Sequence, residues 1–339
     1  MKALVVGGTG FLGSAIASEL VARGHQTFVL SRGQTDRTVA GTTAIHADRF
    51  GDLTTLKDHV FDWVFDTCAY APDAVDRLAG ALGNQVQRYV LISSISAYGR
   101  FDKKGITEDD AAPEANADDL ALAAGLAPGK RASAFSYGSS YGPLKKSCEL
   151  AATARFGARA TALRVGLLVG AGDYTDRLTW WARRIDQAHG NRSKVPAPAP
   201  YDRSVQFIDV RDVADFACQT AENRQGGTWN VSGRPMQLGD LLATISRVAQ
   251  SSAELVWISE TAIEKAGIAP WSDIPLMSPM LPSFQHFLDV SCERAFGAGL
   301  RCRDIEDTLS GLLEWDRNRR EIALKCGMSP QQEAVLLAE

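Results

Sequence analysis

The sequence is poor in the residues that build disulfide frameworks and metal sites, and it has no long apolar run. Six cysteines are spread over 339 residues without a C-x-x-C pair, and the five histidines show no H-x-x-x-H spacing. This pattern predicts reduced, buried thiols and no metal centre. The longest nearly uncharged stretch, residues 267–288, contains Asp273 and is interrupted by four prolines, so we expect no membrane-spanning segment.

Neither sign of charge is in large excess. Lys and Arg number 36 against 40 Asp and Glu, which gives a formal net charge of −4. Nucleic-acid-binding proteins need a basic patch or stripe, so we expect no nucleic-acid partner. The apolar run before Gly7 and Gly8 is too short for the hydrophobic region of a secretion signal, so we expect a cytoplasmic protein. The length favours about two domains, and the composition, 45% apolar and 22% charged, is that of a globular protein.

Short apolar runs alternate with helical patterns over the first 95 residues. The runs fall at 2–6, 27–30, 43–47, 63–65 and 89–92, and helical spacing falls at 14–23 and 72–82. This alternation predicts an α/β fold, a Rossmann-type doubly wound parallel sheet. Further strands are expected at 160–168 and 205–210, and further helices at 212–221, 238–249 and 305–313.

The segment 100–136 breaks this pattern. It is charged and rich in alanine, and it contains two prolines. We predict an exposed loop with one short helix near 118–124, and the alternative is a mobile lid over a binding site.

Three glycines follow the first predicted strand directly. Gly7, Gly10 and Gly13 have G-x-x-G-x-x-G spacing and lead into the first helix. Such glycines permit a tight turn, a close approach of backbone to a pyrophosphate and close packing of helix on sheet. The helix N-terminus then offers free N–H groups to the phosphates. The pattern predicts a dinucleotide site, and the alternative is a purely structural glycine turn.

The end of the second predicted strand bears on the choice of dinucleotide. Sites for NAD place a carboxylate there to bind the ribose hydroxyls, whereas sites for NADP use an arginine for the 2′-phosphate. Here the strand ends in Ser31 and Arg32. This favours NADP, while NAD stays open because Arg32 has the alternative of being a solvated surface charge.

A tyrosine and a lysine stand four residues apart at the start of a predicted helix. Tyr141 and Lys145 therefore lie on one face, and Pro143 is tolerated because it falls in the first turn. A free tyrosine has a pKa near 10, and a neighbouring ammonium favours its phenolate, so the pair is suited to acid/base work on an alcohol or carbonyl. Ser93 and Ser94 end the fifth predicted strand, at the edge where parallel sheets bind ligands.

Together these motifs resemble the extended, atypical short-chain dehydrogenases/reductases, the group of NAD(P)-dependent epimerases and dehydratases. The resemblance continues through residues 164–167, 207–214 and 229–231 and covers about 1–235 clearly. It implies that Ser94 is the catalytic serine, that Tyr141 is the acid/base, and that Lys145 holds the nicotinamide ribose and lowers the pKa of the tyrosine. It also implies that Asp48 and Arg49 contact the adenine.

The predicted contacts fall into two sets. Cofactor contacts are expected at Gly7, Thr9, Gly10, Phe11, Leu12, Gly13, Ser31, Arg32, Asp48, Arg49, Cys68, Ala69, Ser93, Tyr141, Lys145 and Val165. Substrate contacts are expected at Ser96, Tyr174, Arg177 and Trp181. The alternative for the tryptophan is a place in the core of the smaller domain.

Two departures from the family pattern affect the substrate. Members that act on nucleotide sugars often have an arginine and a histidine where this chain has Val205 and Asp209, with Arg203 as a candidate substitute. A pocket short of phosphate ligands binds a diphosphate poorly. We therefore predict an NADP-dependent oxidoreductase that reduces the ketone, or an equivalent polarised double bond, of a small organic substrate.

Two alternatives stay open: an NAD(P)-dependent epimerase or dehydratase of a sugar or nucleotide sugar, and a non-catalytic dinucleotide-binding regulatory or RNA-binding protein. Residues 1–168 and about 204–224 are predicted to form the NAD(P)-binding domain. About 169–203 and 225–339 are predicted to form a smaller, discontinuous substrate domain. The resemblance also implies a homodimer formed through the helix that carries Tyr141.

Overall fold

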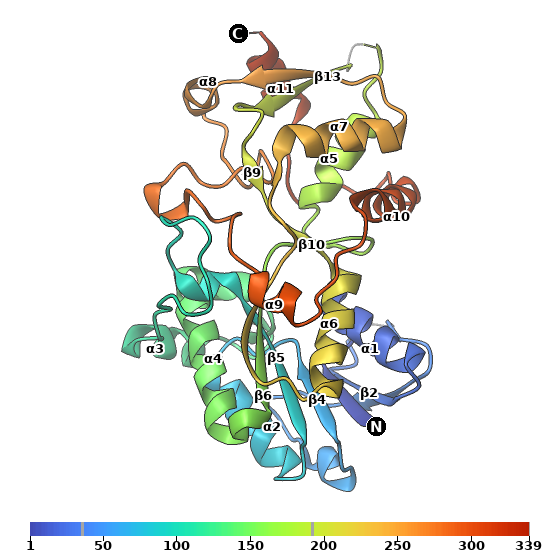
Figure 1. Cartoon of the computed structure of the whole chain (residues 1–339), viewed down its shortest axis with the longest axis vertical. Helices are drawn as coiled ribbons and strands as arrows, with labels where there is room; N and C mark the ends of the chain where they lie inside the picture. The colour runs from blue at the N-terminus through green and yellow to red at the C-terminus, as the bar shows by residue number, and fades with distance from the viewer. Residues whose placement is uncertain (35–36, 191–192, 339) are drawn as a thin grey trace.

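The computed structural model describes residues 1–34, 37–190 and 193–338. A seven-stranded parallel sheet, with the order β11-β6-β5-β4-β1-β2-β3, forms the lower lobe in Figure 1. Its strands are β1 (Lys2–Val6), β2 (Gln26–Ser31), β3 (Thr42–His46), β4 (Trp63–Asp66), β5 (Arg88–Ser94), β6 (Ala160–Val165) and β11 (Gly227–Val231). The order reverses direction at β1, which confirms the predicted doubly wound fold.

Helices cover both faces of this sheet. They are α1 (Phe11–Ala22) and α6 (Val210–Glu222) on one face and α2 (Pro72–Leu82) and α4 (Tyr141–Phe156) on the other. The continuous apolar runs of the strands follow from this double cover, because neighbouring residues pack to opposite sides. In β4, for example, Phe65 packs with the core under α1 and α6, and Val64 packs with the core under α2 and α4.

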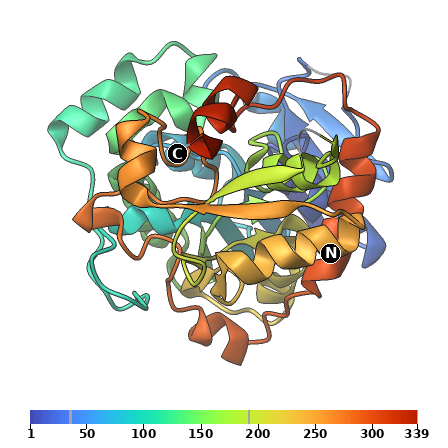
Figure 2. The same ribbon diagram turned by 90° about the horizontal axis from the view of Figure 1, so that it is seen from above.

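The second lobe is built on a small parallel pair of strands. In Figure 2 β8 (Lys194–Pro198) and β13 (Glu254–Ile258) run side by side. The helices of this lobe are α5 (Arg177–Asp186), α7 (Leu238–Ala249), α8 (Glu260–Lys265), α10 (Ile305–Arg317) and α11 (Pro330–Leu337). Its core surrounds Trp181, which is fully buried. Two short ladders complete this part: β7 (Leu168–Val169) with β10 (Ile208–Asp209), and β9 (Ser204–Val205) with β12 (Met236–Gln237).

The structure differs from the sequence prediction at three places. The run expected at 160–168 is two strands, β6 in the main sheet and β7, which pairs with β10. The run expected at 205–210 is two short strands, β9 and β10, which pair with different partners. Residues 225–339 were expected in the second domain, yet β11 pairs with β6 in the main sheet. Ala295 and Leu300, on and just after α9 (Glu293–Gly297), also pack in the core of the sheet.

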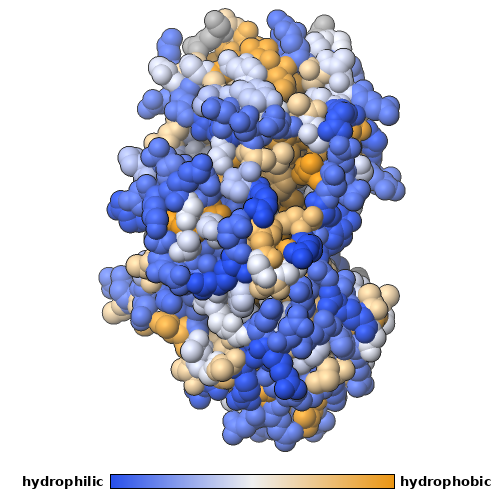
Figure 3. All heavy atoms as spheres, viewed as in Figure 1, coloured by the Kyte–Doolittle hydropathy of each residue, from blue (hydrophilic) through white to orange (hydrophobic). Residues whose placement is uncertain are grey.

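The surface view in Figure 3 is largely hydrophilic, and apolar residues gather where the two lobes meet. Among the described residues, no helix has both the length and the hydropathy that crossing a bilayer requires.

Candidate active site

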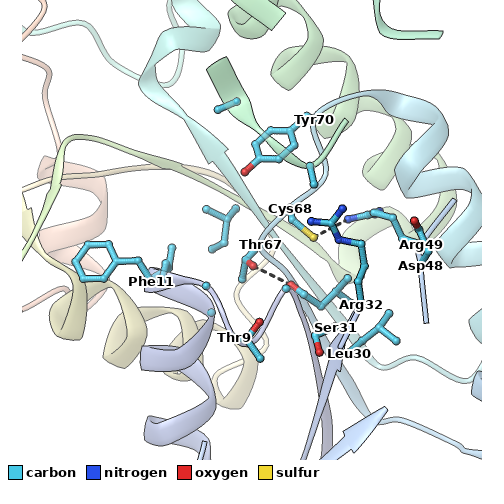
Figure 4. Close-up of a pocket in the computed structure, with 18 of the residues that line it drawn as sticks. Thr9, Phe11, Leu30, Ser31, Arg32, Asp48, Arg49, Thr67, Cys68 and Tyr70 are labelled. Carbon is cyan, nitrogen blue, oxygen red and sulfur yellow. Dashed lines mark hydrogen bonds between the residues drawn. The ribbon is translucent and has the colours of Figure 1, made fainter. Parts of the chain in front are cut away.

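A cavity of about 440 Å³ lies at the carboxyl ends of the central strands (Figure 4). It follows the edge of the sheet where open α/β folds bind ligands. The predicted cofactor contacts that line it are Gly7, Thr9, Gly10, Phe11, Leu12, Gly13, Ser31, Arg32, Asp48, Arg49, Cys68, Ser93, Tyr141, Lys145 and Val165. Ala69 is fully buried and does not line it.

The glycine-rich turn at the centre of the cavity leaves no room for side chains. A Cβ on Gly13 would lie 2.2 Å from the carbonyl oxygen of Gly7, and Gly7 itself has a φ of +77°. Helix α1 begins at Phe11 with Gly10 as its N-cap, so no side chain caps its first N–H groups. These donors are available to an anionic ligand, as the sequence predicts.

At the end of the cavity where the sequence predicts the adenosine, Arg49 is already bound to other parts of the protein. Its guanidinium donates to both carboxylate oxygens of Asp66, at 2.7 and 2.8 Å, and to the carbonyl of Ala74. Burial raises the pKa of Asp66, but the opposing effect of Arg49 and two further hydrogen bonds lowers it overall. Arg49 therefore lines the cavity as part of a buried ion pair. Asp48 accepts the backbone N–H of Phe50 in a turn.

Unlike Arg49, Arg32 is not bound to other side chains among the described residues. It is exposed, and it forms no hydrogen bond or ion pair with any of the described residues. In Figure 4 its side chain extends from the end of β2 toward the side of the cavity where Asp48 and Cys68 lie. The guanidinium is thus free to bind a ligand phosphate.

At the opposite end, the serine, tyrosine and lysine come together as predicted. Helix α4 begins at Tyr141, which puts Tyr141 and Lys145 one turn apart, and the Lys145 Nζ lies 5.9 Å from the tyrosine ring. Ser94 ends β5, and its hydroxyl accepts the N–H of Ser96 at 3.1 Å. The approach depends on Gly142, because a Cβ there would lie 2.2 Å from the carbonyl oxygen of Ser96.

The electrostatics of this end set the protonation of the tyrosine. Burial raises the pKa of Tyr141 to about 12, although the Ser94 hydroxyl favours the phenolate. The pKa lowered by Lys145 that the resemblance implies is therefore wrong for this structure, because burial outweighs the other effects on the phenol. The phenol is thus a proton donor at neutral pH. Lys145 is 1% exposed and donates to the carbonyls of Ala69 and Ile92 at 2.8 and 2.7 Å, while burial lowers its pKa.

Tyr70 is a lining residue that the sequence analysis missed. It follows β4, its ring lies 4.8 Å from the Lys145 Nζ and 6.2 Å from the ring of Tyr141, and its hydroxyl points into the cavity in Figure 4. Burial, followed by Tyr141, raises its pKa well above 10, so it remains a neutral phenol. Its position just after a strand that ends at the cavity was the only signal in the sequence.

The charged segment 100–136 also reaches the cavity. It forms α3 (Ala117–Gly125), close to the predicted helix, and Pro128, Ala132 and Ala134 line the cavity. Arg131 of this segment stacks on Phe50, 3.8 Å from the ring centre, and donates to Asp73 at 2.5 Å. The segment is therefore fixed beside the adenosine end by these contacts.

A buried ion pair between Glu149 and Arg164 lies between α4 and β6, next to the end of the cavity that holds Tyr141 and Lys145. Glu149, one turn after Lys145 on α4, accepts from Arg164 on β6 at 2.9 and 2.8 Å and from the Ser93 hydroxyl at 2.6 Å. Arg164 in turn lies 4.6 Å from the ring centre of Tyr98. This network connects the helix that carries Tyr141 and Lys145 to the strand that carries the serines.

The predicted substrate contacts are only partly brought together. Tyr174 lines the cavity and is exposed, and Arg177 stacks on Trp271 at 4.7 Å without an ion pair to a described residue. Ser96 lies in the turn after β5 and does not line the cavity. The prediction that Trp181 contacts the substrate is wrong. Its side chain is fully buried in the core of the second lobe, and its indole N–H donates to the carbonyl of Pro275.

The positions that depart from the family pattern hold no free cationic group in the cavity lining. Val205 is fully buried, and the Asp209 carboxylate accepts from Arg211 and from Thr308. Arg203, the candidate substitute, donates to Glu260 and to the carbonyl of Ala199. These side chains are bound within the protein.

The comparisons with known proteins bear on the N-terminal part of the chain and on the fold. Residues 3–86 match the family described as "NAD dependent epimerase/dehydratase family". No curated protein matches the chain in sequence. The match to the family and the shared fold confirm the resemblance to extended short-chain dehydrogenases/reductases that the motifs indicate.

Several solved structures share the fold over nearly the whole chain. One is the UDP-N-acetylglucosamine 4-epimerase of Methanobrevibacter ruminantium M1, with 19% identity, a TM-score of 0.66 and coverage of 94% of this chain and 98% of that one. Another is the UDP-Glc/GlcNAc 4-epimerase of Campylobacter jejuni, with 14% identity, a TM-score of 0.63 and coverage of 94% and 99%. A third is MoeE5 in complex with UDP-glucuronic acid and NAD, with 19% identity, a TM-score of 0.61 and coverage of 95% and 100%.

Proposed function

We propose that the protein is an NAD(P)-dependent enzyme of the epimerase/dehydratase type, acting on a carbon that carries a hydroxyl or carbonyl oxygen. The main supporting observation is one cavity lined by a glycine-rich turn and, at one end, by Tyr141 and Lys145. Ser94 does not line the cavity, but its hydroxyl lies within hydrogen-bonding reach of Tyr141. The residues present fit a dinucleotide, because a Cβ at Gly13 would fill the turn and because the N-terminus of α1 is uncapped.

In this proposal a bound nicotinamide supplies or accepts hydride at the substrate carbon. Tyr141 exchanges the proton on the substrate oxygen, and the Ser94 hydroxyl holds the same oxygen by a hydrogen bond. Because the pKa of Tyr141 is about 12, its phenol is protonated at neutral pH and can donate a proton in the reducing direction. In the oxidising direction it has to be a phenolate, which the ammonium of Lys145 stabilises.

The sequence favours an enzyme that reduces a ketone with exchangeable NADPH. The matched family and the solved structures favour epimerase or dehydratase chemistry, which is the alternative given in the sequence analysis. We place the latter first. The substrate we propose is a hydroxy or keto compound without a nucleoside diphosphate, since Val205 is buried and apolar, Asp209 is anionic, and Arg203 already pairs with Glu260. The reductase remains the second candidate because Arg32 is free to bind the 2′-phosphate of NADP.

Cofactor retention separates the two candidates. An epimerase returns its hydride, so the purified protein should contain dinucleotide and show no net change in absorbance of the nicotinamide during turnover. A reductase should bind cofactor reversibly and consume NADPH with a carbonyl compound from a panel. In both cases Tyr141→Phe should lower kcat by about 10² to 10⁴-fold. An undiminished kcat in that variant would overturn the role of Tyr141 as the acid/base, and absence of turnover by the wild type in both assays would leave the non-catalytic alternative.

The choice between NADP and NAD has its own test. Titration of NADPH and NADH against the wild type and Arg32→Ala should show a loss of about tenfold or more for NADPH alone, the loss of one charge-assisted contact. Equal affinity for NADPH in both proteins would show that Arg32 does not select the cofactor. Homodimerisation through α4 and a cytoplasmic location stay predictions.

A further inference from the structure

Three arginines meet at the edge of the sheet opposite the cavity. Arg88 is the first residue of β5, Arg159 directly precedes β6, and Arg224 stands three residues before β11. These strands are neighbours in the order β11-β6-β5, and all are parallel, so their starts lie together at the lower end of the sheet in Figure 1. The three side chains line one depression of about 490 Å³.

None of these three arginines forms an ion pair with a described residue. Arg88 donates to the carbonyl of Ala158 and to the Thr161 hydroxyl, and Arg159 donates to the carbonyls of residues 84 and 86. Arg224 is exposed and has no partner among the described residues. Glu222 is the one carboxylate that lines the depression among the described residues, and its two oxygens accept from Arg23 and His25, so three positive charges face one negative charge.

This arrangement is exceptional for the chain. Buried arginines elsewhere face carboxylates, namely Arg49 with Asp66, Arg164 with Glu149 and Arg183 with Asp316. Arg88 is 5% exposed, and its Nε, like that of Arg49, has no hydrogen-bond partner among the described residues; what distinguishes Arg88 is that no carboxylate faces it. Burial first, and then the charges of Arg224 and Arg159, lower its pKa. Like charges held together in this way are stabilised by a bound anion.

We propose that this depression is a binding site for a phosphate group, either inorganic phosphate or the phosphate of a small phosphorylated metabolite. Planar guanidinium groups with free N–H donors match the tetrahedral oxyanion. The site lies across the sheet from the proposed catalytic centre, so its occupancy does not depend on the proposed function.

The test is isothermal titration calorimetry of the full-length protein with inorganic phosphate, with sodium chloride at equal ionic strength as the baseline. Arg224→Gln is the informative variant, because the side chain is exposed and unpaired and its removal leaves the core intact. We expect saturable binding to the wild type and about tenfold weaker binding to Arg224→Gln, from the loss of one charge-assisted contact.

Two control variants have the same change in net charge. Arg155→Gln alters an exposed arginine on α4 whose partner is Asp76, outside the depression. Arg32→Gln reports phosphate bound at the glycine-rich turn instead. Both should keep wild-type phosphate affinity at the arginine site. Absence of binding beyond the chloride baseline would overturn the proposal, as would equal weakening by Arg155→Gln or no weakening by Arg224→Gln.

Where phosphate binds, comparison with glycerol phosphate and ribose phosphate distinguishes the source. Tighter binding of a phosphate ester than of inorganic phosphate identifies a metabolite site. The reverse order identifies a site for the free anion.

Discussion

The ion pair behind the catalytic helix allows a quantitative prediction. Glu149 is 3% exposed and accepts three hydrogen bonds, two from Arg164 and one from the Ser93 hydroxyl. Glu149→Gln keeps the shape and one acceptor but removes the charge, which leaves Arg164 buried without a counter-ion. Loss of one partner of a buried pair costs about 3–5 kcal/mol, and we expect about 3 kcal/mol here because the amide oxygen still accepts.

The measurement is urea-induced unfolding followed by circular dichroism, with the free energy of unfolding extrapolated to water. Asp76→Asn is the matched control, because Asp76 pairs with Arg155 on the surface, where such pairs contribute about 0–1 kcal/mol. The double variant Glu149→Leu with Arg164→Met removes both charges. Its loss in free energy of unfolding should be smaller than the sum of the losses in the single variants Glu149→Leu and Arg164→Met. A loss of under about 1 kcal/mol for Glu149→Gln, or strict additivity in the double variant, would refute the reasoning.

Three further predictions concern the glycines and the acid stability. Gly13→Ala places a Cβ 2.2 Å from the carbonyl of Gly7 and should abolish NAD(P) binding measured by fluorescence titration, whereas Gly80→Ala meets nothing within 4 Å and should leave it unchanged. Gly142→Ala places a Cβ 2.2 Å from the carbonyl oxygen of Ser96, just after β5. It should lower kcat more than cofactor affinity, because it displaces Tyr141, the proposed acid/base. Equal effects on kcat and affinity would argue for general misfolding. The pKa of Asp66 is lowered in the folded protein, so its contribution to stability is present above its ordinary value of 3.8 and is lost as the pH falls below it. Thermal unfolding between about pH 5 and pH 2 should show a steeper decline for the wild type than for Asp66→Asn.

The sequence predicts the sheet well because its strands are buried on both faces. Continuous apolar runs, glycine turns and helical spacing are local signals, and they locate β1 to β5 to within one or two residues. The pairing of Tyr141 with Lys145 is equally local, because one helical turn separates them. That Ser94 lies beside them follows from the parallel sheet, which brings the carboxyl ends of strands together.

The contacts that were not foreseen are nonlocal. From the sequence, Arg49 is a candidate adenine contact. In the structure both of its terminal nitrogens donate to Asp66, which ends another strand. Trp181 resembles a pocket residue because its neighbours in sequence do not reveal the core it enters. Tyr70 belongs to no motif, and only the folded structure places its ring over Lys145.

The late position of β11 in the chain has a consequence for synthesis on the ribosome. Strand β6 ends at residue 165, but its partner β11 begins at residue 227, after β8 of the second lobe. Until β11 emerges, the apolar strand β6 is an open sheet edge with unpaired backbone groups. The main sheet therefore cannot be completed before α5 and β8 of the second lobe have been synthesised. A nascent chain stalled between β6 and β11 should be the form that aggregates or recruits chaperones.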